Sequence, residues 1–284
     1  MQKDGNVFDR TGLAALSDLK TPEWRELFDE LEREQNTFEA YEGKFRSREY
    51  KWPRDPLHTW SRIWEYPYIF YHLRSLRSRW SVRQRPKVVD LGSGVTFFPF
   101  AVARLGFDVT CLDIDPICEK DLNAAISLIH HAPGNVSFRL IEDSRLPAED
   151  SEVNVIYCIS VLEHIRDVET TISETARILK QGGLLILSFD IDLRGDQQLG
   201  VAEYGRLQEA LARYYEPLLP DETKHPADVL TSITSPLGFR SPHKPRLLYH
   251  DCKQVVKVLL GRPEKYLLPF HLAVQGLVLR RRRR

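Results

Sequence analysis

Residues 88–94, with the sequence VVDLGSG, constrain the fold of this chain more than any other segment. The apolar residues predict a buried strand with an acid, Asp90, near its end, and Gly92 and Gly94 predict a tight turn into a helix. Glycine permits such a turn and leaves no side chain between the backbone and a ligand. The segment therefore predicts a nucleotide-like ligand at the end of a strand.

A dinucleotide site is a poor match to this turn. The pattern G-x-G-x-x-G would need a third glycine at position 97, where the chain has Phe97. A ring there removes the close contact between helix and strand that the pattern uses beside a pyrophosphate. The sequence therefore disfavours a nicotinamide-dependent dehydrogenase.

Three further strands are predicted at residues 108–113, 136–141 and 153–159, with helical segments between the strands. Asp113 follows Asp90 by 23 residues, a spacing at which a carboxylate accepts hydrogen bonds from both ribose hydroxyls. Charged hydrogen bonds of this kind contribute about 1.5–3 kcal/mol each. Alternating strands and helices predict a mainly parallel sheet covered on both faces, which binds its ligand where the strand order reverses.

Four segments in this order, VVDLGSG, VTCLDID, IEDSRLP and NVIYCISVLEHI, resemble the class I S-adenosylmethionine-dependent methyltransferases, in their small-molecule branch. The resemblance covers about residues 86–190, with a last strand near 272–279. It implies a doubly wound, mainly parallel α/β sheet of seven strands, the last antiparallel, and S-adenosyl-L-methionine as the cofactor. Two departures are Thr96-Phe97, where many members carry a further glycine, and Asn154, where an acid often opens the fourth strand.

The resemblance also implies roles for individual residues. Asp90 would orient the methionine end, Asp113 would bind the ribose, and either Glu142 or Asp143, with Asp143 favoured, would accept a hydrogen bond from the adenine amino group. The full predicted cofactor-binding set is Asp90, Gly92, Ser93, Gly94, Asp113, Ile114, Glu142, Asp143, Ser144 and Ser160.

Purely structural alternatives remain for several of these residues. Asp90 has the appearance of a capping acid as well as of a ligand, the two glycines fit a plain tight turn, and Ile114 fits a core position at a strand end. We expect Asp115 to cap the helix that opens at Pro116 rather than to bind a ligand.

Catalysis by in-line displacement at a sulfonium methyl group depends mainly on the position of the acceptor, which contributes about 7–11 kcal/mol to lowering a barrier. A hydroxyl acceptor also has to lose its proton, and a well-placed base adds about 10²–10⁴-fold. The candidate bases are His164, Asp190 and Glu65, which the sequence does not rank. His164 and its neighbour Glu163 also fit a structural role.

Two regions are predicted, an N-terminal helical cap or lid at 1–85 and the cofactor-binding α/β domain at 86–284. In the first, Thr21 and Pro22 predict the start of a helix, and a second helix is expected from Pro67 to about Trp80. Residues 51–67 are dense in Trp, Tyr and Pro and predict a lid or an irregular connection. One apolar face of the first helix carries Trp24, Leu27, Phe28, Leu31 and Phe38.

The acceptor follows mainly by exclusion, because the motifs of exocyclic-amine and cytosine-C5 DNA methylation are missing. A small molecule, sugar or lipid-linked saccharide remains, and nucleic acid is disfavoured. Aromatic residues ahead of the core could stack on a sugar ring, although a hydrophobic clamp for the N-terminal helices is the favoured interpretation. These residues are Trp60, Trp64, Tyr66 and Tyr68.

Composition agrees with a globular enzyme. Lysine plus arginine and aspartate plus glutamate each number 40, so no global field attracts nucleic acid. The four cysteines form no C-x-x-C pair, which favours buried free thiols over a metal site or disulfides. With no signal-peptide core and no apolar run of about 20 residues, we expect a cytoplasmic location.

Arginines cluster before the first core strand, and the chain closes with five more, from Arg280 to Arg284. Such clusters are commonly solvated faces, although they also attract phosphate or anionic lipid, so peripheral membrane contact through the tail stays open. Two alternative functions follow. An RNA-modifying methyltransferase would show steeply salt-dependent RNA binding, and a methyltransferase-like scaffold subunit, suggested by Thr96-Phe97, would bind the cofactor weakly or not at all. The oligomeric state is left open.

Overall fold

A sheet of eight strands runs through the described part of the chain, which in this computed structural model comprises residues 6–193, 199–238 and 271–283. The strand order is β1-β8-β6-β5-β2-β3-β4, with β7 paired to β8. Neighbouring strands from β4 to β6 are parallel, and β8 is antiparallel to β6. The strands are β1 (Gly12–Leu13), β2 (Lys87–Leu91), β3 (Asp108–Asp113), β4 (Asn135–Leu140), β5 (Val153–Ile159), β6 (Leu179–Asp192), β7 (Tyr215–Pro217) and β8 (Leu272–Arg281).

The predicted fold class, a doubly wound and mainly parallel α/β sheet, is confirmed. The strand count differs from the expected seven, because Gly12 and Leu13 form a short strand that pairs antiparallel with Gly276 and Gln275 of β8. The N-terminal extension therefore adds a strand to the sheet as well as helices.

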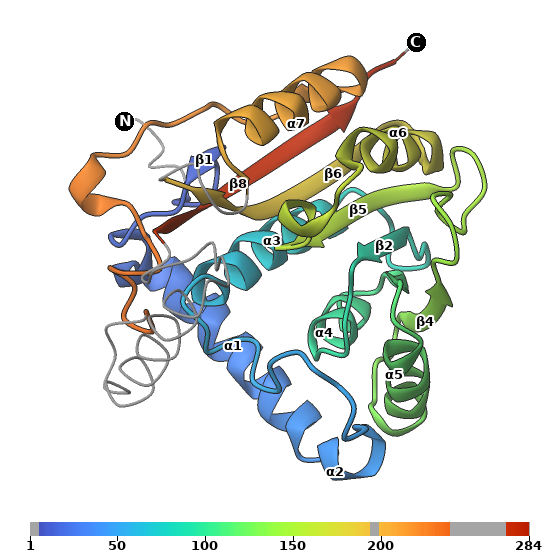
Figure 1. The fold of residues 1–284 in the computed structure, drawn as a ribbon. Helices are drawn as coiled ribbons and strands as arrows, with labels where there is room; N and C mark the ends of the chain where they lie inside the picture. Colours follow the sequence, from blue (N-terminus) through green and yellow to red (C-terminus); the bar gives the residue numbers. More distant parts are fainter. Residues whose placement is uncertain (1–5, 194–198, 239–270, 284) are drawn as a thin grey trace, which may run out of the picture.

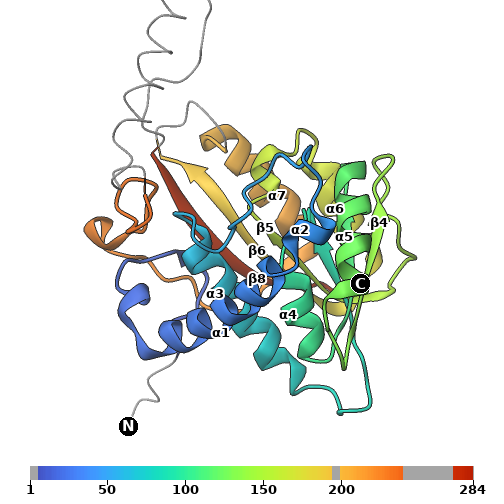
Figure 2. The same ribbon diagram turned by 90° about the horizontal axis from the view of Figure 1, so that it is seen from below.

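Helices cover both faces of this sheet (Figures 1 and 2). α1, α3, α4 and α5 share one apolar cluster with the sheet, and α6 and α7 share the cluster on the other face. No helix in the described residues is long and apolar enough to cross a bilayer. The helices are α1 (Pro22–Glu39), α2 (Glu42–Phe45), α3 (Arg62–Arg77), α4 (Phe98–Arg104), α5 (Pro116–Leu128), α6 (Val168–Ile178) and α7 (Val201–Tyr214), with 3-10 turns η1 (Asp18–Lys20), η2 (Leu162–His164) and η3 (Pro226–Asp228).

The strand order reverses at β2. From β2 the chain builds outward through β3 and β4, and it then returns to β5 on the opposite side of β2. Crossovers that leave in opposite directions open a crevice at the carboxyl ends of the two central strands, where ligands of such sheets bind. The ends of β2, β3 and β5 therefore meet at one place.

Helix α1 begins as predicted. Thr21 accepts a hydrogen bond at its Oγ1 from the N–H of Trp24 at 3.2 Å, and Pro22 occupies the first helical position. A threonine cap satisfies one of the free N–H groups at the start of a helix. Leu27, Leu31 and Phe38 are buried, as the apolar periodicity indicates.

Helix α3 begins at Arg62, so the predicted start at Pro67 is wrong. A proline inside a helix cannot donate to the carbonyl four residues earlier, which here is that of Ile63. That carbonyl instead accepts a hydrogen bond from Nε1 of Trp24 in α1, at 2.7 Å. The tertiary contact replaces the missing backbone bond and lets the helix run through Pro67.

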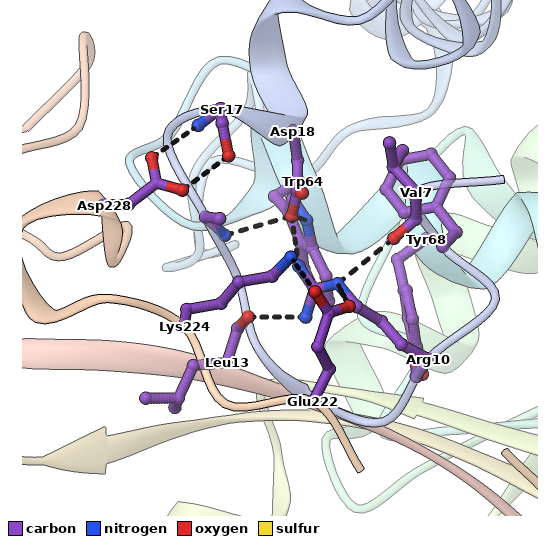
Figure 3. A network of polar contacts seen from close by, with 12 residues as sticks. Val7, Arg10, Leu13, Ser17, Asp18, Trp64, Tyr68, Glu222, Lys224 and Asp228 are labelled. Carbon is purple, nitrogen blue, oxygen red and sulfur yellow. Dashed lines mark hydrogen bonds and ion pairs between the residues drawn. The ribbon is translucent and has the colours of Figure 1, made fainter. Parts of the chain in front are cut away.

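A buried polar network fixes α3 to the N-terminal segment (Figure 3). The guanidinium of Arg10 pairs with Asp18, and Asp18 Oδ2 also accepts the indole N–H of Trp64 at 2.8 Å. From the same helix, the hydroxyl of Tyr68 donates to the carbonyl of Arg10 at 3.0 Å. Glu222 lies 3.4 Å from Arg10 Nε, which ties the segment to the chain before η3. Residues far apart in sequence thus hold α3 against the sheet.

Candidate active site

A cavity of about 430 Å³ lies at the carboxyl ends of β2, β3, β5 and β6. Its volume falls in the range of small-molecule sites, about 300–1,000 Å³. The segment between α2 and α3 supplies one part of the lining, and the strand ends supply the other. The lining residues are Tyr50, Trp52, Pro53, Pro56, Thr59, Trp60, Ser61, Arg62, Tyr66, Asp90, Leu91, Gly92, Ser93, Gly94, Thr96, Phe98, Asp113, Ile114, Ile141, Ile159, Ser160, Val161, Glu163, His164, Ile165 and Asp190.

The turn after β2, which we call the glycine elbow (residues 92–94), needs both of its glycines. Gly92 and Gly94 have φ of 74° and 53°, in the left-handed region that side chains other than glycine rarely adopt. A Cβ at Gly92 would lie 2.5 Å from Val161 Cγ2. The elbow thus presents bare backbone to the cavity because nothing larger fits.

Asp113 lies directly at this elbow. Its Oδ2 accepts the N–H of Gly94 at 2.9 Å, and its Oδ1 accepts the N–H of Asp115 at 3.0 Å. The predicted cap is confirmed, since Asp115 Oδ1 accepts the N–H of Ile117 at 2.9 Å at the start of α5. Two backbone bonds hold the carboxylate of Asp113 in one orientation beside the cavity.

Asp90 lies under the elbow and is buried, with 5% of its surface exposed. Burial raises the pKa of its carboxyl to about 8, and the charge of Asp113 adds to the rise. A positively charged group that approaches a buried carboxyl stabilises its ionised form. This environment suits a partner that carries positive charge.

Ser160 ends β5 in an unusual backbone conformation. Its φ is 48°, although it is not glycine, and its hydroxyl donates to both carboxylate oxygens of Glu65 at 2.8 and 3.0 Å. Glu65 is fully buried in α3 and pairs with Arg62 Nη1 at 2.9 Å. Helix α3 therefore reaches into the crevice and supports the end of a central strand. Glu65, a predicted base, does not itself line the cavity.

Two more carboxylates, those of Glu163 and Asp190, complete an acidic recess with Arg62 and Glu65. Glu163 Oε1 accepts the backbone N–H of Asp190 at 3.2 Å. Burial, followed by the charges of Glu163 and Glu65, raises the pKa of Asp190 well above its usual value, and Arg62 opposes this rise. Burial and the charge of Glu65 likewise raise the pKa of Glu163. We call these four residues the carboxylate recess.

Two oxygens of the recess are unpartnered. Neither Glu163 Oε2 nor Asp190 Oδ1 has a hydrogen-bond partner within the described ranges. Nor is any group of three or more His, Cys, Asp or Glu side chains there arranged to hold a metal ion. The recess therefore has capacity to accept hydrogen bonds from a ligand.

His164, the third predicted base, lines the same cavity with an exposed side chain. Part of the ring is nevertheless shielded from water, and this desolvation, followed by the charge of Arg62, lowers its pKa. The ring is therefore a weaker proton acceptor than an ordinary histidine. The structure brings His164 and Asp190 to one cavity and places Glu65 behind them.

Three predicted cofactor residues lie elsewhere. Glu142, Asp143 and Ser144 are exposed and are not part of the cavity lining, to which their neighbour Ile141 belongs. Strand β4 ends at Leu140, so the chain has already turned outward at these positions, and Asp143 accepts the N–H of Arg145 at 2.7 Å. Glu142 and Asp143 therefore lie outside the cavity lining, and their contact with the adenine amino group stays a prediction.

The aromatic group ahead of the core divides between two roles. Trp60 and Tyr66 line the cavity, whereas Trp64 and Tyr68 are buried and stack at 4.5 Å. The clamp interpretation holds for this second pair, which packs against β8 at Gly276. The contact is so close that a Cβ added to Gly276 would lie 2.7 Å from the Tyr68 ring.

Phe97, which stands in place of the further glycine, is buried rather than exposed to the cavity. Its ring lies 5.3 Å from that of Tyr66 in α3. The departure at this position thus provides packing for the N-terminal extension. Thr96 beside it remains in the cavity lining.

Most of the arginines that cluster in the sequence have partners within the chain. Arg74 pairs with Glu30, and Arg77 donates to the carbonyl of Leu105 at 2.9 Å. At the C-terminus, Arg280 pairs with Glu216 at 2.8 Å. Arg281 and Arg282 donate to backbone carbonyls, and Arg284 lies outside the described residues.

Sequence reasoning missed Tyr50 and Arg62. Tyr50 accepts the N–H of Val95 at 3.0 Å and lines the cavity, and Arg62 is the cation of the recess. Both lie outside the four family-like segments. No periodicity marks them, because their roles depend on how α3 and the preceding loop fold back onto the sheet.

Comparison with known proteins agrees with this geometry. Residues 89–187 match the family model described as a methyltransferase domain, which spans the elbow, Asp113 and Ser160. This match identifies residues 89–187 as a methyltransferase domain. That domain supplies every lining residue except those of the N-terminal extension and Asp190.

Relatives of this methyltransferase domain include ubiquinone biosynthesis O-methyltransferases. The protein of Thiobacillus denitrificans is 28% identical over 123 residues, which cover 42% of this chain and 52% of that protein. The protein of Xanthomonas oryzae is 29% identical over 181 residues, which cover 63% of this chain and 66% of that protein. The chain thus spans between about half and two thirds of the length of these curated relatives.

Solved structures support the methyltransferase fold. The YcgJ protein of Bacillus subtilis has a TM-score of 0.51 at 18% identity, covering 75% of this chain and 99% of that one. The [4+2]-cyclase SpnF has a TM-score of 0.51 at 16% identity, covering 89% and 95%. Because a protein named a cyclase shares this fold, the fold alone does not decide the reaction.

Proposed function

We propose that this chain transfers the methyl group of S-adenosyl-L-methionine to a hydroxyl group of a small molecule. The observation that carries the proposal is the meeting of the glycine elbow, Asp90 and Asp113 with the carboxylate recess in one cavity. The relatives named O-methyltransferases support a hydroxyl as the acceptor group.

The residues at the elbow fit this cofactor. The carboxylate of Asp113, which lines the cavity, suits two ribose hydroxyls, and Ile114, with 75% of its surface exposed, offers an apolar face for a flat ring. Asp90 faces the cavity as a buried carboxyl that gains from a nearby cation. When bound, S-adenosyl-L-methionine supplies an electrophilic methyl group on a positively charged sulfur. The chain then has to orient it and hold the acceptor in line.

The remaining lining indicates the acceptor's shape. Trp52, Trp60, Tyr66 and Phe98 present aromatic surface to the cavity, together with two prolines. Such rings bury an apolar body and leave the polar end of a ligand to the few polar groups nearby. We therefore propose an acceptor with an apolar, ring-sized body, and sugar and lipid-linked acceptors are further compounds for a screen.

Calorimetry with S-adenosyl-L-methionine tests the cofactor assignment. We expect micromolar binding, weakened at least tenfold in Asp113→Ala, because one charged hydrogen bond contributes about 1.5–3 kcal/mol. Asp143→Ala is the matched control, since it removes a carboxylate at the next strand that lies outside the cavity. Failure of the wild-type chain to bind would support the scaffold alternative, and salt-dependent RNA binding would support the RNA alternative.

We also infer that the protein works in a reducing compartment such as the cytoplasm. What supports this is that Cys111, Cys118 and Cys158 are free and buried, as is usual where thiols stay reduced. Cys252 lies outside the described residues. Thiol titration of a Cys252→Ser variant purified without reductant is expected to detect the three buried cysteines only after unfolding.

A further inference from the structure

The carboxylate recess has no role in binding the cofactor as proposed above. Three carboxylates and a single guanidinium gather there, from helix α3 (Arg62, Glu65), turn η2 (Glu163) and strand β6 (Asp190). Glu65 already accepts a hydrogen bond from the hydroxyl of Ser160 and pairs with Arg62, so its oxygens are engaged. The unengaged acceptor capacity lies on Glu163 and Asp190.

Asp190 is the member most in need of a partner. Only 9% of its surface is exposed, it lines the cavity, and its Oδ1 bonds to nothing in the described part of the chain. A buried polar atom without a partner costs about 1–3 kcal/mol, so such atoms in native proteins usually serve a function. Because a carboxylate oxygen accepts, its missing partner is a donor, such as a hydroxyl group.

We propose that Asp190 is the general base of the methyl transfer and takes the proton of the acceptor's hydroxyl. This inference rests on the proposed function. The O–H proton passes to Asp190 Oδ1, and the acceptor oxygen forms its new bond to the methyl carbon. The carbon–sulfur bond breaks with its electron pair on sulfur, which leaves a methyl ether, a neutral thioether and a protonated carboxyl. That proton leaves later to solvent.

Electrostatics around Asp190 favour it over His164. Burial and the charges of Glu163 and Glu65 make Asp190 hold a proton more tightly, with only Arg62 opposing. The same Arg62 and burial weaken His164 as a proton acceptor. Proton transfer is most efficient when the pKa of the base lies near the working pH, and these shifts move Asp190 toward that range.

The strength of this base limits the acceptor. A carboxylate with a raised pKa can take a proton from a hydroxyl about as acidic as that of phenol, with a pKa of about 10. A hydroxyl as weak an acid as water lies far beyond its reach. The aromatic lining of the cavity suits the ring that such a hydroxyl is attached to. Phenol itself and 4-nitrophenol, which is more acidic, are therefore suitable probes.

The test measures methylation of these two phenols with labelled S-adenosyl-L-methionine. In Asp190→Asn we expect the rate with phenol to fall by about 10²–10⁴-fold. The loss with 4-nitrophenol is expected to be at least tenfold smaller, because that acceptor ionises without help. Asp192→Asn is the matched control, with the same change two residues further along β6 and outside the cavity lining. Calorimetry with the cofactor verifies that each variant is folded.

Glu163→Gln provides a second, independent readout. Removing its charge lowers the pKa of Asp190, so the rise of the wild-type rate with pH is expected to shift to lower pH by about one unit. Equal losses with both phenols in Asp190→Asn, or an unshifted pH profile in Glu163→Gln, would overturn the assignment. So would a wild-type chain that binds the cofactor and methylates neither phenol. Absence of cofactor binding would overturn the proposed function and this inference with it.

Discussion

The two halves of the cavity are built in different ways. The glycine elbow and its carboxylate Asp113 come from adjacent strands and hold each other through backbone bonds within residues 92–117. The carboxylate recess joins α3, η2 and β6, and the bond from Ser160 to Glu65 spans 95 positions of sequence. One half is local, and the other depends on the position of a helix.

This difference teaches where each half is vulnerable. The elbow depends on backbone conformation, so a change at a single glycine disturbs it directly. The recess depends on contacts that fix α3 to the N-terminal segment (Figure 3), and these contacts are made by residues outside the cavity lining. Substitutions at the two places should separate cofactor affinity from the chemistry of the recess.

The largest effect is expected for Asp18→Ala, which breaks the network that holds α3. The change leaves the buried guanidinium of Arg10 without its main partner and Trp64 Nε1 without its acceptor. Removing one member of a buried ion pair costs about 3–5 kcal/mol. We expect a loss of that size in the free energy of unfolding, measured by urea denaturation.

Asp228→Ala is the control for this change. Asp228 also accepts two hydrogen bonds from the same segment, both from Ser17, but these are exposed. Exposed contacts of this kind contribute about 1 kcal/mol or less. Equal losses in Asp18→Ala and Asp228→Ala would show that the buried network does not anchor α3.

A smaller loss is expected for Gly92→Ala, which acts on the elbow alone. Alanine would have to adopt φ near 74° and place its Cβ 2.5 Å from Val161. Strain and overpacking of this kind cost about 1–3 kcal/mol. We also expect cofactor affinity to fall at least tenfold by calorimetry, because the elbow must shift away from Val161.

Gly43→Ala provides the matched control. Gly43 lies in α2, and a Cβ there would meet nothing within 4 Å. The same substitution at such a site is neutral or stabilises by about 0.4–1 kcal/mol. If Gly92→Ala behaved like Gly43→Ala, the claim that the elbow requires glycine would be wrong.

The contrast between local and distant contacts also explains what the sequence could predict. The parallel strands, the elbow and the Asp115 cap follow from contiguous patterns, and all three are present. The start of α3 was wrong because a contact from Trp24 overrides the proline. The outward position of Asp143 depends on where β4 ends. The sequence could not locate that end, because it left open whether Glu142 or Asp143 was the relevant acid.

The recess shows the limit most clearly. Sequence reasoning named Glu65 and Asp190 as separate candidate bases, without placing them together. Their relation depends on Arg62 and on the register of β6 beside β5. Neither is encoded in a short motif, because a helix must first dock across the strand ends.

We expect the ionisation of Asp90 to lower the free energy of unfolding of the ligand-free protein by about 1.4 kcal/mol for each pH unit of increase. Its folded pKa of about 8 lies above the ordinary value of 3.8, so the folded state binds more protons between these values. The stabilisation is complete below the unfolded pKa and is lost as pH rises through the folded one. Asp90→Asn removes this dependence. Between pH 6 and pH 7, the free energy of unfolding of the variant should therefore rise by about 1.4 kcal/mol relative to that of the wild type.

Urea denaturation at the two pH values measures this difference. Asp143→Asn, the same change at an exposed position, serves as the control. Asp90→Asn should also weaken cofactor binding, since an amide cannot ionise when a positively charged group approaches it. Parallel slopes for Asp90→Asn and the wild type would refute the buried, protonated state of Asp90.

The smallest effect tests how α3 tolerates its proline. Trp24→Phe removes the donor to the Ile63 carbonyl and should cost about 1 kcal/mol, the usual net value of one hydrogen bond. In a Pro67→Ala background, the new N–H of residue 67 lies in position to donate to Ile63, so the same change should cost close to nothing. A double-mutant cycle then gives a coupling of about 1 kcal/mol, and the packing lost with each side chain cancels. An equal cost in both backgrounds would mean that Trp24 stabilises α3 by packing alone, and that the orphaned carbonyl is satisfied in another way.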